Sequence, residues 1–179
     1  MSANALIVVD VQQNMFVGPW PVADATELGL RVESAIADAR QHGDVIVHVQ
    51  NDGPAGDIDE PFSPGWELLF PAADGEIVVR KTVQNTFESN PELATQLKAR
   101  GVDHLVIVGV QSEMCLQATA LGALEAGFRV TVPRALHGTY NEWDLNGAEP
   151  GTGRSADQIS DEVQAGLEAA GVQYGAVGH

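Results

Sequence analysis

The sequence predicts a three-layer α-β-α fold whose central sheet is doubly wound and mostly parallel. Short apolar runs rich in β-branched residues recur along the chain, and such runs are typical of strands buried on both faces. Stretches of helical period lie between them, and strands that alternate with helices form parallel sheets covered on both sides. The predicted strands span residues 5–9, 45–49, 77–80, 105–110 and 128–132.

The helices are predicted from apolar residues at helical spacing and from their end signals. Residues 26–42 place Leu28, Val32 and Ile36 on one face, and Gly43 ends this helix. A polar turn over residues 111–114 precedes the helix that Cys115 opens. The other expected helices span residues 91–100, capped by Ser89 or Asn90, and residues 160–170, and a last strand is possible within 171–179.

Two segments between these elements read as irregular. Residues 50–74 are rich in Gly, Pro and Asp and predict a long loop, with one helical turn near residues 66–69. Loops of this length in compact domains are often functional. Residues 85–87 are expected to form a turn.

Size and composition indicate one soluble globular domain over residues 1–179. A chain of 179 residues with 44% hydrophobic residues can bury a substantial core. The sequence has no apolar run long enough for a membrane helix, and its N-terminal stretch does not resemble a signal peptide. A single cysteine permits no internal disulfide, which fits a cytoplasmic protein.

The charge balance bears on partners. Nine basic residues stand against 25 acidic ones, for a formal net charge of −16. This excess disfavours nucleic acid and anionic membranes as partners, because both are themselves negatively charged. The acidic residues are dispersed, so the charge supports solubility and does not identify a substrate.

Three residues with side chains able to act as acid, base or nucleophile stand at the carboxyl ends of predicted strands: Asp10, Lys81 and Cys115. In an open parallel sheet these ends meet at the edge where ligands bind, so residues distant in sequence can lie together. Each has an ordinary structural alternative. Asp10 could be a helix cap or turn former, Lys81 a solvated charge, and Cys115 a small buried hydrophobic residue.

Three stretches carry a resemblance to a known family: ALIVVDVQQNMF at residues 5–16, VVRKTVQNTF at 78–87, and LVIVGVQSEMCLQATALGALEAGFRV at 105–130. The chain resembles the isochorismatase-like cysteine hydrolases, which include nicotinamidases, N-carbamoylsarcosine amidohydrolase and streptothricin hydrolases. The resemblance implies that Asp10, Lys81 and Cys115 form a catalytic triad. It also implies a cis peptide bond between Val110 and Gln111, and a homodimer or homotetramer.

The residue types suit hydrolysis of an amide through a thioester. Cys115 would attack the carbonyl carbon, and Asp10 would accept the thiol proton and pass it to the leaving amine. Lys81 and the helix N-terminus are expected to stabilise a thiolate, and Lys81 would also orient Asp10. The resemblance further implies that the backbone N–H groups of Gln111 and Cys115 hold the oxyanion.

The chain departs from the nicotinamidase pattern after the predicted strand at residues 45–49. Nicotinamidases carry an Asp-x-His metal motif there, whereas residues 49–53 read Val-Gln-Asn-Asp-Gly. We therefore expect no metal and no cofactor, and nicotinamide is disfavoured as a substrate. His137 and Tyr140 stand where relatives often place a histidine and an aromatic residue facing the pocket, whereas His48, inside a strand, is expected to belong to the core.

Several aromatic and polar side chains are candidates for lining a substrate pocket, because pockets are lined mainly by apolar and aromatic groups with a few polar ones. Each of them could equally belong to the core or to a subunit interface. The candidates are Phe16, Trp20, Asn85, Phe87, Met114 and Tyr140, with Trp66 in the long loop as a further possibility.

The favoured function is hydrolysis of a small amide, ureide or lactam C–N bond by a cysteine nucleophile. One alternative is an isochorismatase that cleaves a vinyl ether, in which the aspartate would matter more than the thiol. Another is a non-catalytic domain that binds a ligand or senses oxidants through Cys115. Nucleotide binding is disfavoured, since no GxGxxG follows the first strand and no GxxxxGK[ST] occurs.

Overall fold

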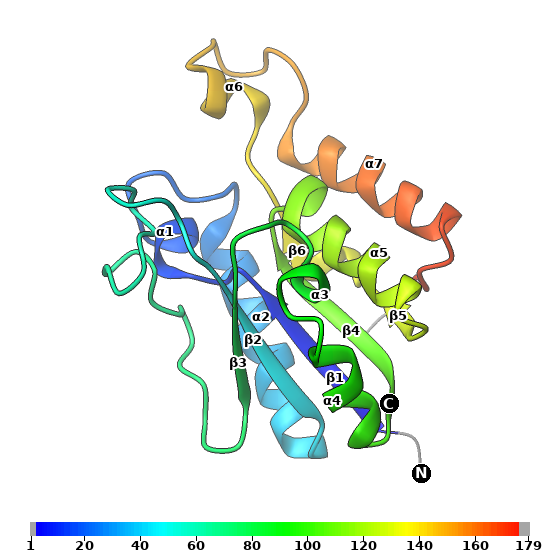
Figure 1. Ribbon diagram of the computed structural model, residues 1–179. Helices are drawn as coiled ribbons and strands as arrows, with labels where there is room; N and C mark the ends of the chain where they lie inside the picture. The colour runs from blue at the N-terminus through cyan, green and yellow to red at the C-terminus, as the bar shows by residue number, and fades with distance from the viewer. Residues whose placement is uncertain (1–2, 176–179) are drawn as a thin grey trace.

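The computed structural model describes residues 3–175, which form a parallel sheet with helices on both faces (Figure 1). The strand order is β3-β2-β1-β4-β5, and β6 pairs with β4 beyond the end of β5. Every strand pair is parallel, so the predicted fold class is confirmed. The strands are β1 Ala3–Val9, β2 Val45–Asn51, β3 Ile77–Lys81, β4 Val102–Val110, β5 Arg129–Thr131 and β6 His137–Gly138.

The helices divide between the two faces of the sheet. One face packs against α2, and the other packs against α3, α4, α5 and α7, which lie in front of the sheet in Figure 1. The segment with α6 projects from the body of the molecule. The helices are α1 Gln13–Phe16, α2 Ala25–His42, α3 Thr86–Ser89, α4 Leu93–Ala99, α5 Gln117–Glu125, α6 Glu142–Asn146 and α7 Ala156–Ala169.

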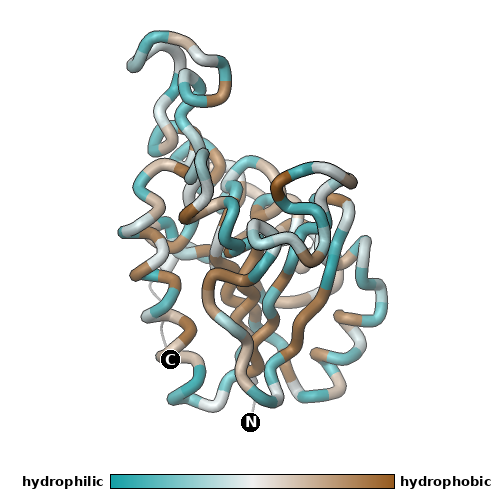
Figure 2. Tube along the Cα trace, turned by 90° about the vertical axis from the view of Figure 1, so that its left-hand side faces the viewer, coloured by the Kyte–Doolittle hydropathy of each residue, from teal (hydrophilic) through white to brown (hydrophobic). Residues whose placement is uncertain are grey.

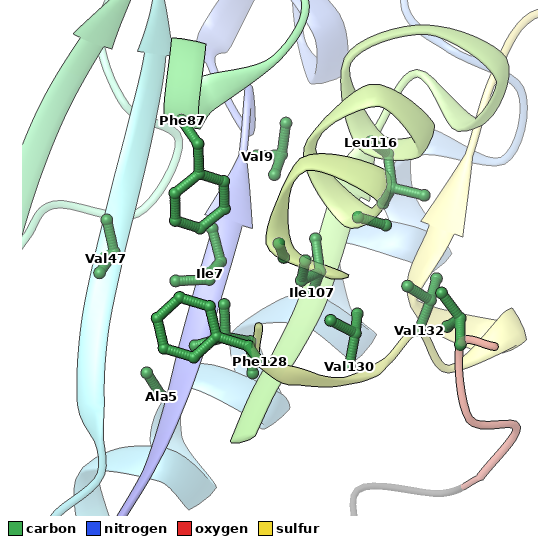
Figure 3. Close-up of a cluster of buried hydrophobic side chains, with 14 of the residues drawn as sticks. Ala5, Ile7, Val9, Val47, Phe87, Ile107, Leu116, Phe128, Val130 and Val132 are labelled. Carbon is green, nitrogen blue, oxygen red and sulfur yellow. The ribbon is translucent and has the colours of Figure 1, made fainter. Parts of the chain in front are cut away.

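Alternate residues of the central strands point into two separate hydrophobic cores, one on each face of the sheet. In β1, Ile7 and Val9 point to the core under α3, α4, α5 and α7, whereas Leu6 and Val8 face α2. Figure 3 shows the first of these cores, where Phe87 and other apolar side chains fill the space between strands and helices. The central strands β1 and β4 are largely buried on both faces and appear in the sequence as continuous hydrophobic runs. Figure 2 shows such hydrophobic segments running through the middle of the molecule.

A topological switch point lies between β1 and β4. The chain leaves β1 through α2 on one face and reaches β4 through α3 and α4 on the other, so a crevice opens beyond the carboxyl ends of these two strands. Gly109, with φ of +121°, lies where they come closest. A Cβ atom there would collide with the carbonyl oxygen of Val9, so glycine permits this approach.

Several predicted boundaries were wrong. The turn expected at residues 85–87 is the start of α3. Asn85 caps the N-terminus of this helix, because its side chain accepts a hydrogen bond from the backbone N–H of Phe87. The helix expected over 91–100 is the shorter α4, and its N-cap is Glu92 instead of Ser89 or Asn90. The turn near residues 66–69 is not helical, because Leu68 forms a β-bridge with Gln12.

The C-terminal region also differs from the prediction. The last helix begins four residues early at Ala156, because Ser155 and Gln158 form a capping box. α6 was not predicted at all. Of the strand expected in residues 171–179, Gln173 forms a single bridge with Thr131, and residues 176–179 lie outside the described residues. Within residues 3–175, none of the helices combines the length and the apolar character needed to span a bilayer.

Candidate active site

The structure brings together the three strand-end residues Asp10, Lys81 and Cys115. Lys81 Nζ lies 2.9 Å from Asp10 Oδ2 and 3.1 Å from Cys115 Sγ. It also donates to Asn51 Oδ1 at 3.1 Å. The lysine therefore links a carboxylate, a thiol and an amide at the switch point of the sheet.

The ends of the strands fix the ion pair. Asp10 follows β1 in a left-handed conformation, with φ of +52°, and its N–H donates to the carbonyl of Val49 on the neighbouring strand. Lys81 is the last residue of β3, where it pairs in register with Asn51. Asp10 and Lys81 are each only 2% exposed, so this is a buried ion pair with little access to water.

Cys115 lies in a tight turn, Ser112–Leu116, which we call the Cys115 turn. The helix predicted to follow Cys115 is present as α5, which begins at Gln117. Before it, the Cys115 turn is kinked at Met114, with φ of −119° and ψ of −106°. The carbonyl of Gln111 accepts from the N–H groups of Met114 and Leu116. The peptide bond between Val110 and Gln111, just before the turn, is cis.

The electrostatics of the cluster follow from burial. Loss of solvation raises the pKa of the Asp10 carboxyl, and the Lys81 ammonium offsets only part of this effect. For Lys81, burial lowers the pKa, but Asp10 and Cys115 outweigh it and the net shift is upward. Oδ1 of Asp10 is buried and has no hydrogen-bond partner among the described residues, so it can accept a proton.

The expected stabilisation of a thiolate is not what the structure indicates. Burial and the charge of Asp10 raise the pKa of the Cys115 thiol to about 12, and Lys81 offsets only part of this. These shifts favour a neutral Cys115 thiol beside a carboxyl group whose pKa is also raised.

A cavity of about 260 Å³ opens next to the thiol. Several of its lining residues lie at the end of β2 or just after β3, so their position on the sheet was the signal that the sequence held for them. The polar groups come from side-chain amides and a hydroxyl, and the apolar ones from two methionines and a valine. The lining comprises Asp10, Met15, Asn51, Thr82, Val83, Gln84, Gln111, Met114 and Cys115.

Comparison with known proteins assigns the chain to a family. The isochorismatase domain family matches residues 4–149. The chain belongs to the isochorismatase family. A streptothricin hydrolase of Streptomyces noursei is 41% identical over 96% of this chain and 64% of its own length. This chain thus spans less than two thirds of that relative.

Further relatives are similar to this chain in sequence or in fold. A maleamate amidohydrolase of Pseudomonas putida is 30% identical over 73% of this chain and 70% of its own length. The crystal structure of an isochorismatase from Pseudomonas putida superposes with a TM-score of 0.83, covering 96% of this chain and 86% of that one. At 24% identity, this structural likeness concerns the fold alone.

Of the side chains expected to line the pocket of this isochorismatase-family domain, only Met114 borders the cavity at Cys115. Phe16 is buried in the core beneath α2, and Phe87 in the opposite core against Phe128. Asn85 caps α3 and packs on Gly122, where a Cβ would collide with its amide.

The remaining aromatic candidates also lie elsewhere. Trp20 and Tyr140 line a separate, outward-facing hollow, where the Tyr140 hydroxyl donates to the backbone carbonyl of Trp20. Trp66 is buried beneath the Arg80 guanidinium, and its indole N–H donates to Asp52. Aromatic character alone did not separate core positions from pocket positions.

Neither histidine singled out from the sequence lines the cavity. His48 is buried within β2 and pairs with Glu76 at 2.8 Å, which confirms the expectation that it belongs to the core. His137, expected to face the pocket, is instead buried behind the Cys115 turn, where it contacts Ser112 and Gln164. Among residues 3–175, no three His, Cys, Asp or Glu side chains are grouped so as to hold a metal ion.

Proposed function

We propose that the chain is a cysteine-dependent amidohydrolase that cleaves a small amide, ureide or lactam C–N bond through a thioester intermediate. The observation that carries this is the thiol of Cys115 lying 3.1 Å from Lys81, itself 2.9 Å from Asp10, at a cavity. A nucleophile, a base and a cation that orients the base suit acyl transfer. The names of the streptothricin hydrolase and maleamate amidohydrolase relatives point to the same class.

The first half of the reaction forms the thioester. Sγ of Cys115 attacks the carbonyl carbon while its proton passes to Asp10, whose unpartnered Oδ1 is the free acceptor. The same proton then moves to the leaving nitrogen, the C–N bond breaks and the amine departs. Because the resting thiol is neutral, attack and proton transfer are coupled, and no free thiolate needs to accumulate.

The second half restores the enzyme. Water attacks the thioester carbon and gives its proton to Asp10, the C–S bond breaks, and the sulfur recovers the proton as the carboxylic acid leaves. In both halves the carbonyl oxygen becomes negative, and we expect the backbone N–H groups of Gln111 and Cys115 to donate hydrogen bonds to it. Lys81 holds Asp10 in position throughout by its ion pair.

The cavity supports a small substrate, or the reactive part of a larger one. Its volume of about 260 Å³ is at the low end for ligand sites. Asn51, Gln84 and Gln111 offer amide donors and acceptors, and Met15 and Met114 offer apolar contact. This lining suits a neutral, planar amide or ureide better than a highly charged group.

The test is release of ammonia or amine from small amides, ureides and a streptothricin-type lactam, with and without EDTA. We expect turnover by the wild type that EDTA leaves unchanged, and a loss of about a thousandfold or more in Cys115→Ala. Lys98→Ala, which changes an exposed lysine, is the matched control for Lys81→Ala, which should also lose turnover.

Two results would overturn the proposal. Unchanged amide turnover in Cys115→Ala would remove the nucleophile. Pyruvate release from isochorismate by both the wild type and Cys115→Ala, without turnover of any amide, would assign the site to vinyl-ether cleavage.

A further inference from the structure

A second buried polar cluster lies directly behind the Cys115 turn. Ser112, the first residue of the turn, is fully buried, and its hydroxyl contacts His137 Nδ1 at 2.8 Å and Ser160 Oγ at 2.9 Å. His137 Nε2 lies 3.2 Å from Gln164 Oε1. We call Ser112, His137, Ser160 and Gln164 the rear cluster; it joins the Cys115 turn to β6 and α7.

The hydrogen bonds of the rear cluster have one consistent direction. Gln164 Nε2 donates to Glu168, which orients the amide so that Oε1 faces His137 and accepts from its Nε2–H. The ring is neutral because burial lowers the pKa of His137 to about 4, so Nδ1 carries no proton and accepts from the Ser112 hydroxyl. Ser160 then donates to the remaining lone pairs of Ser112.

The hydrogen bond from Ser112 to His137 matters because the Cys115 turn lacks the regular hydrogen bonding of an α-helix. The dihedral angles at Met114 interrupt it, and two N–H groups share the carbonyl of Gln111, at 3.1 and 3.3 Å. A side-chain anchor at Ser112, three residues before Cys115, therefore constrains where the thiol lies. The thiol contact with Lys81, at 3.1 Å, is the geometry that such an anchor would preserve.

We propose that His137 is a positioning residue that holds the Cys115 thiol against Lys81 by accepting a hydrogen bond from Ser112. His137 does not line the cavity and takes no part in proton transfer. The inference rests on the proposed function for its catalytic meaning, but the placement of the thiol can be measured without turnover.

Two near-isosteric substitutions separate the two ends of the imidazole. In His137→Asn the side-chain oxygen can occupy the place of Nδ1 and accept from Ser112. In His137→Gln the side-chain N–H group reaches the place of Nε2 and keeps the bond to Gln164, whereas the Nδ1 acceptor is lost. His48→Asn, which alters an equally buried histidine in β2, is the matched control.

The experiment follows alkylation of Cys115, the only cysteine, by iodoacetamide across pH 7 to 10, using mass spectrometry. We expect slow alkylation in wild type, His48→Asn and His137→Asn. In His137→Gln and Ser112→Ala the freed thiol should react faster at pH 8 by about tenfold or more, with the pH profile shifted towards that of an ordinary thiol. Urea unfolding of each variant confirms that it is folded.

The outcomes separate this inference from the proposed function. Alkylation as slow in folded His137→Gln and Ser112→Ala as in wild type would overturn the positioning role, as would equal acceleration in His137→Asn and His137→Gln. If the amidase proposal holds, His137→Gln should lower kcat more than it raises KM, and His137→Asn should restore kcat. Unchanged turnover in Cys115→Ala would remove the amidase proposal and leave the alkylation result standing.

Discussion

Two buried polar clusters lie on opposite sides of one short turn, and they differ in how completely their groups are paired. In front, Asp10, Lys81 and Cys115 border a cavity, and one carboxylate oxygen of Asp10 has no partner among the described residues. Behind, Ser112 and His137 belong to a closed set of hydrogen bonds. The contrast separates the two tasks of the turn: a fully paired cluster fixes geometry, whereas an incompletely paired one is able to move a proton.

The front cluster should be the more sensitive of the two to loss of one partner. Lys81→Ala leaves the Asp10 carboxylate buried and unpaired, and breaking a buried ion pair in this way costs about 3–5 kcal/mol. We expect the free energy of unfolding, measured by urea denaturation at pH 7.5, to fall by that amount. Lys98→Ala should lower it less, by about 1 kcal/mol, since Lys98 is exposed and loses only a hydrogen bond to the Ala126 carbonyl and a contact with the Phe128 ring.

A double variant sharpens this prediction. Asp10→Asn combined with Lys81→Met removes both charges, so it should recover much of the stability lost in Lys81→Ala while remaining inactive. If Lys81→Ala alone is as stable as the wild type, the pair is not the buried, mutually dependent element described here.

The rear cluster should be sensitive to acid instead. Burial lowers the pKa of His137 from about 6.5 in the unfolded chain to about 4 in the folded one, and the nearby Arg134 adds to this while Gln164 and Asp161 oppose it. The unfolded state therefore binds the proton first as pH falls. The contribution of neutral His137 to the free energy of unfolding is therefore complete above pH 6.5 and is lost as the pH falls through 4.

The difference should be about 2–3 kcal/mol between pH 7.5 and pH 4.5. His137→Asn removes the titrating group but keeps the acceptor for Ser112, so its loss of stability over the same interval should be smaller by that amount. Glu76, whose pKa is lowered to about 2 chiefly by its hydrogen bond with Arg40, contributes equally to the pH dependence of both proteins and cancels in the comparison. Equal pH dependence in the two proteins would mean that His137 is not buried as a neutral ring.

The sequence predicted the front cluster far better than the rear one, for a physical reason. Asp10, Lys81 and Cys115 stand at the ends of strongly apolar strands, and the parallel sheet brings such ends together. The rear cluster joins Ser112 to Ser160, which are 48 residues apart, through a two-residue strand and a helix whose start was misplaced. No periodicity marks such contacts.

The pocket lining shows a similar limit of pattern reasoning. Aromatic character predicts pocket positions for Phe16 and Phe87, yet they fill the two cores, where large apolar groups contribute most to stability. Asn51 ends β2, and Thr82 and Gln84 follow β3, but their neutral side chains do not mark a reactive site by their chemistry. Position on the sheet was the better guide than residue type.

Asp10 helps burial to keep the Cys115 thiol neutral, and this yields a prediction in which thiol reactivity and amide turnover move in opposite directions. After burial, the Asp10 carboxylate contributes most to raising the pKa of Cys115, and Lys81 opposes it. In Asp10→Asn the carboxylate charge is lost while Lys81 remains free to pair with a thiolate. Alkylation of Cys115 by iodoacetamide at pH 8 should then become about tenfold faster, equivalent to a fall of about one unit in its pKa.

Amide turnover should nevertheless be lost, because no base remains to carry the proton to the leaving nitrogen. Asp38→Asn, an exposed change on α2, should alter neither rate. Slower or unchanged alkylation in Asp10→Asn would show that the carboxylate does not hold the thiol neutral, and the distinction between a reactive front and a fixed rear would then need another origin than charge.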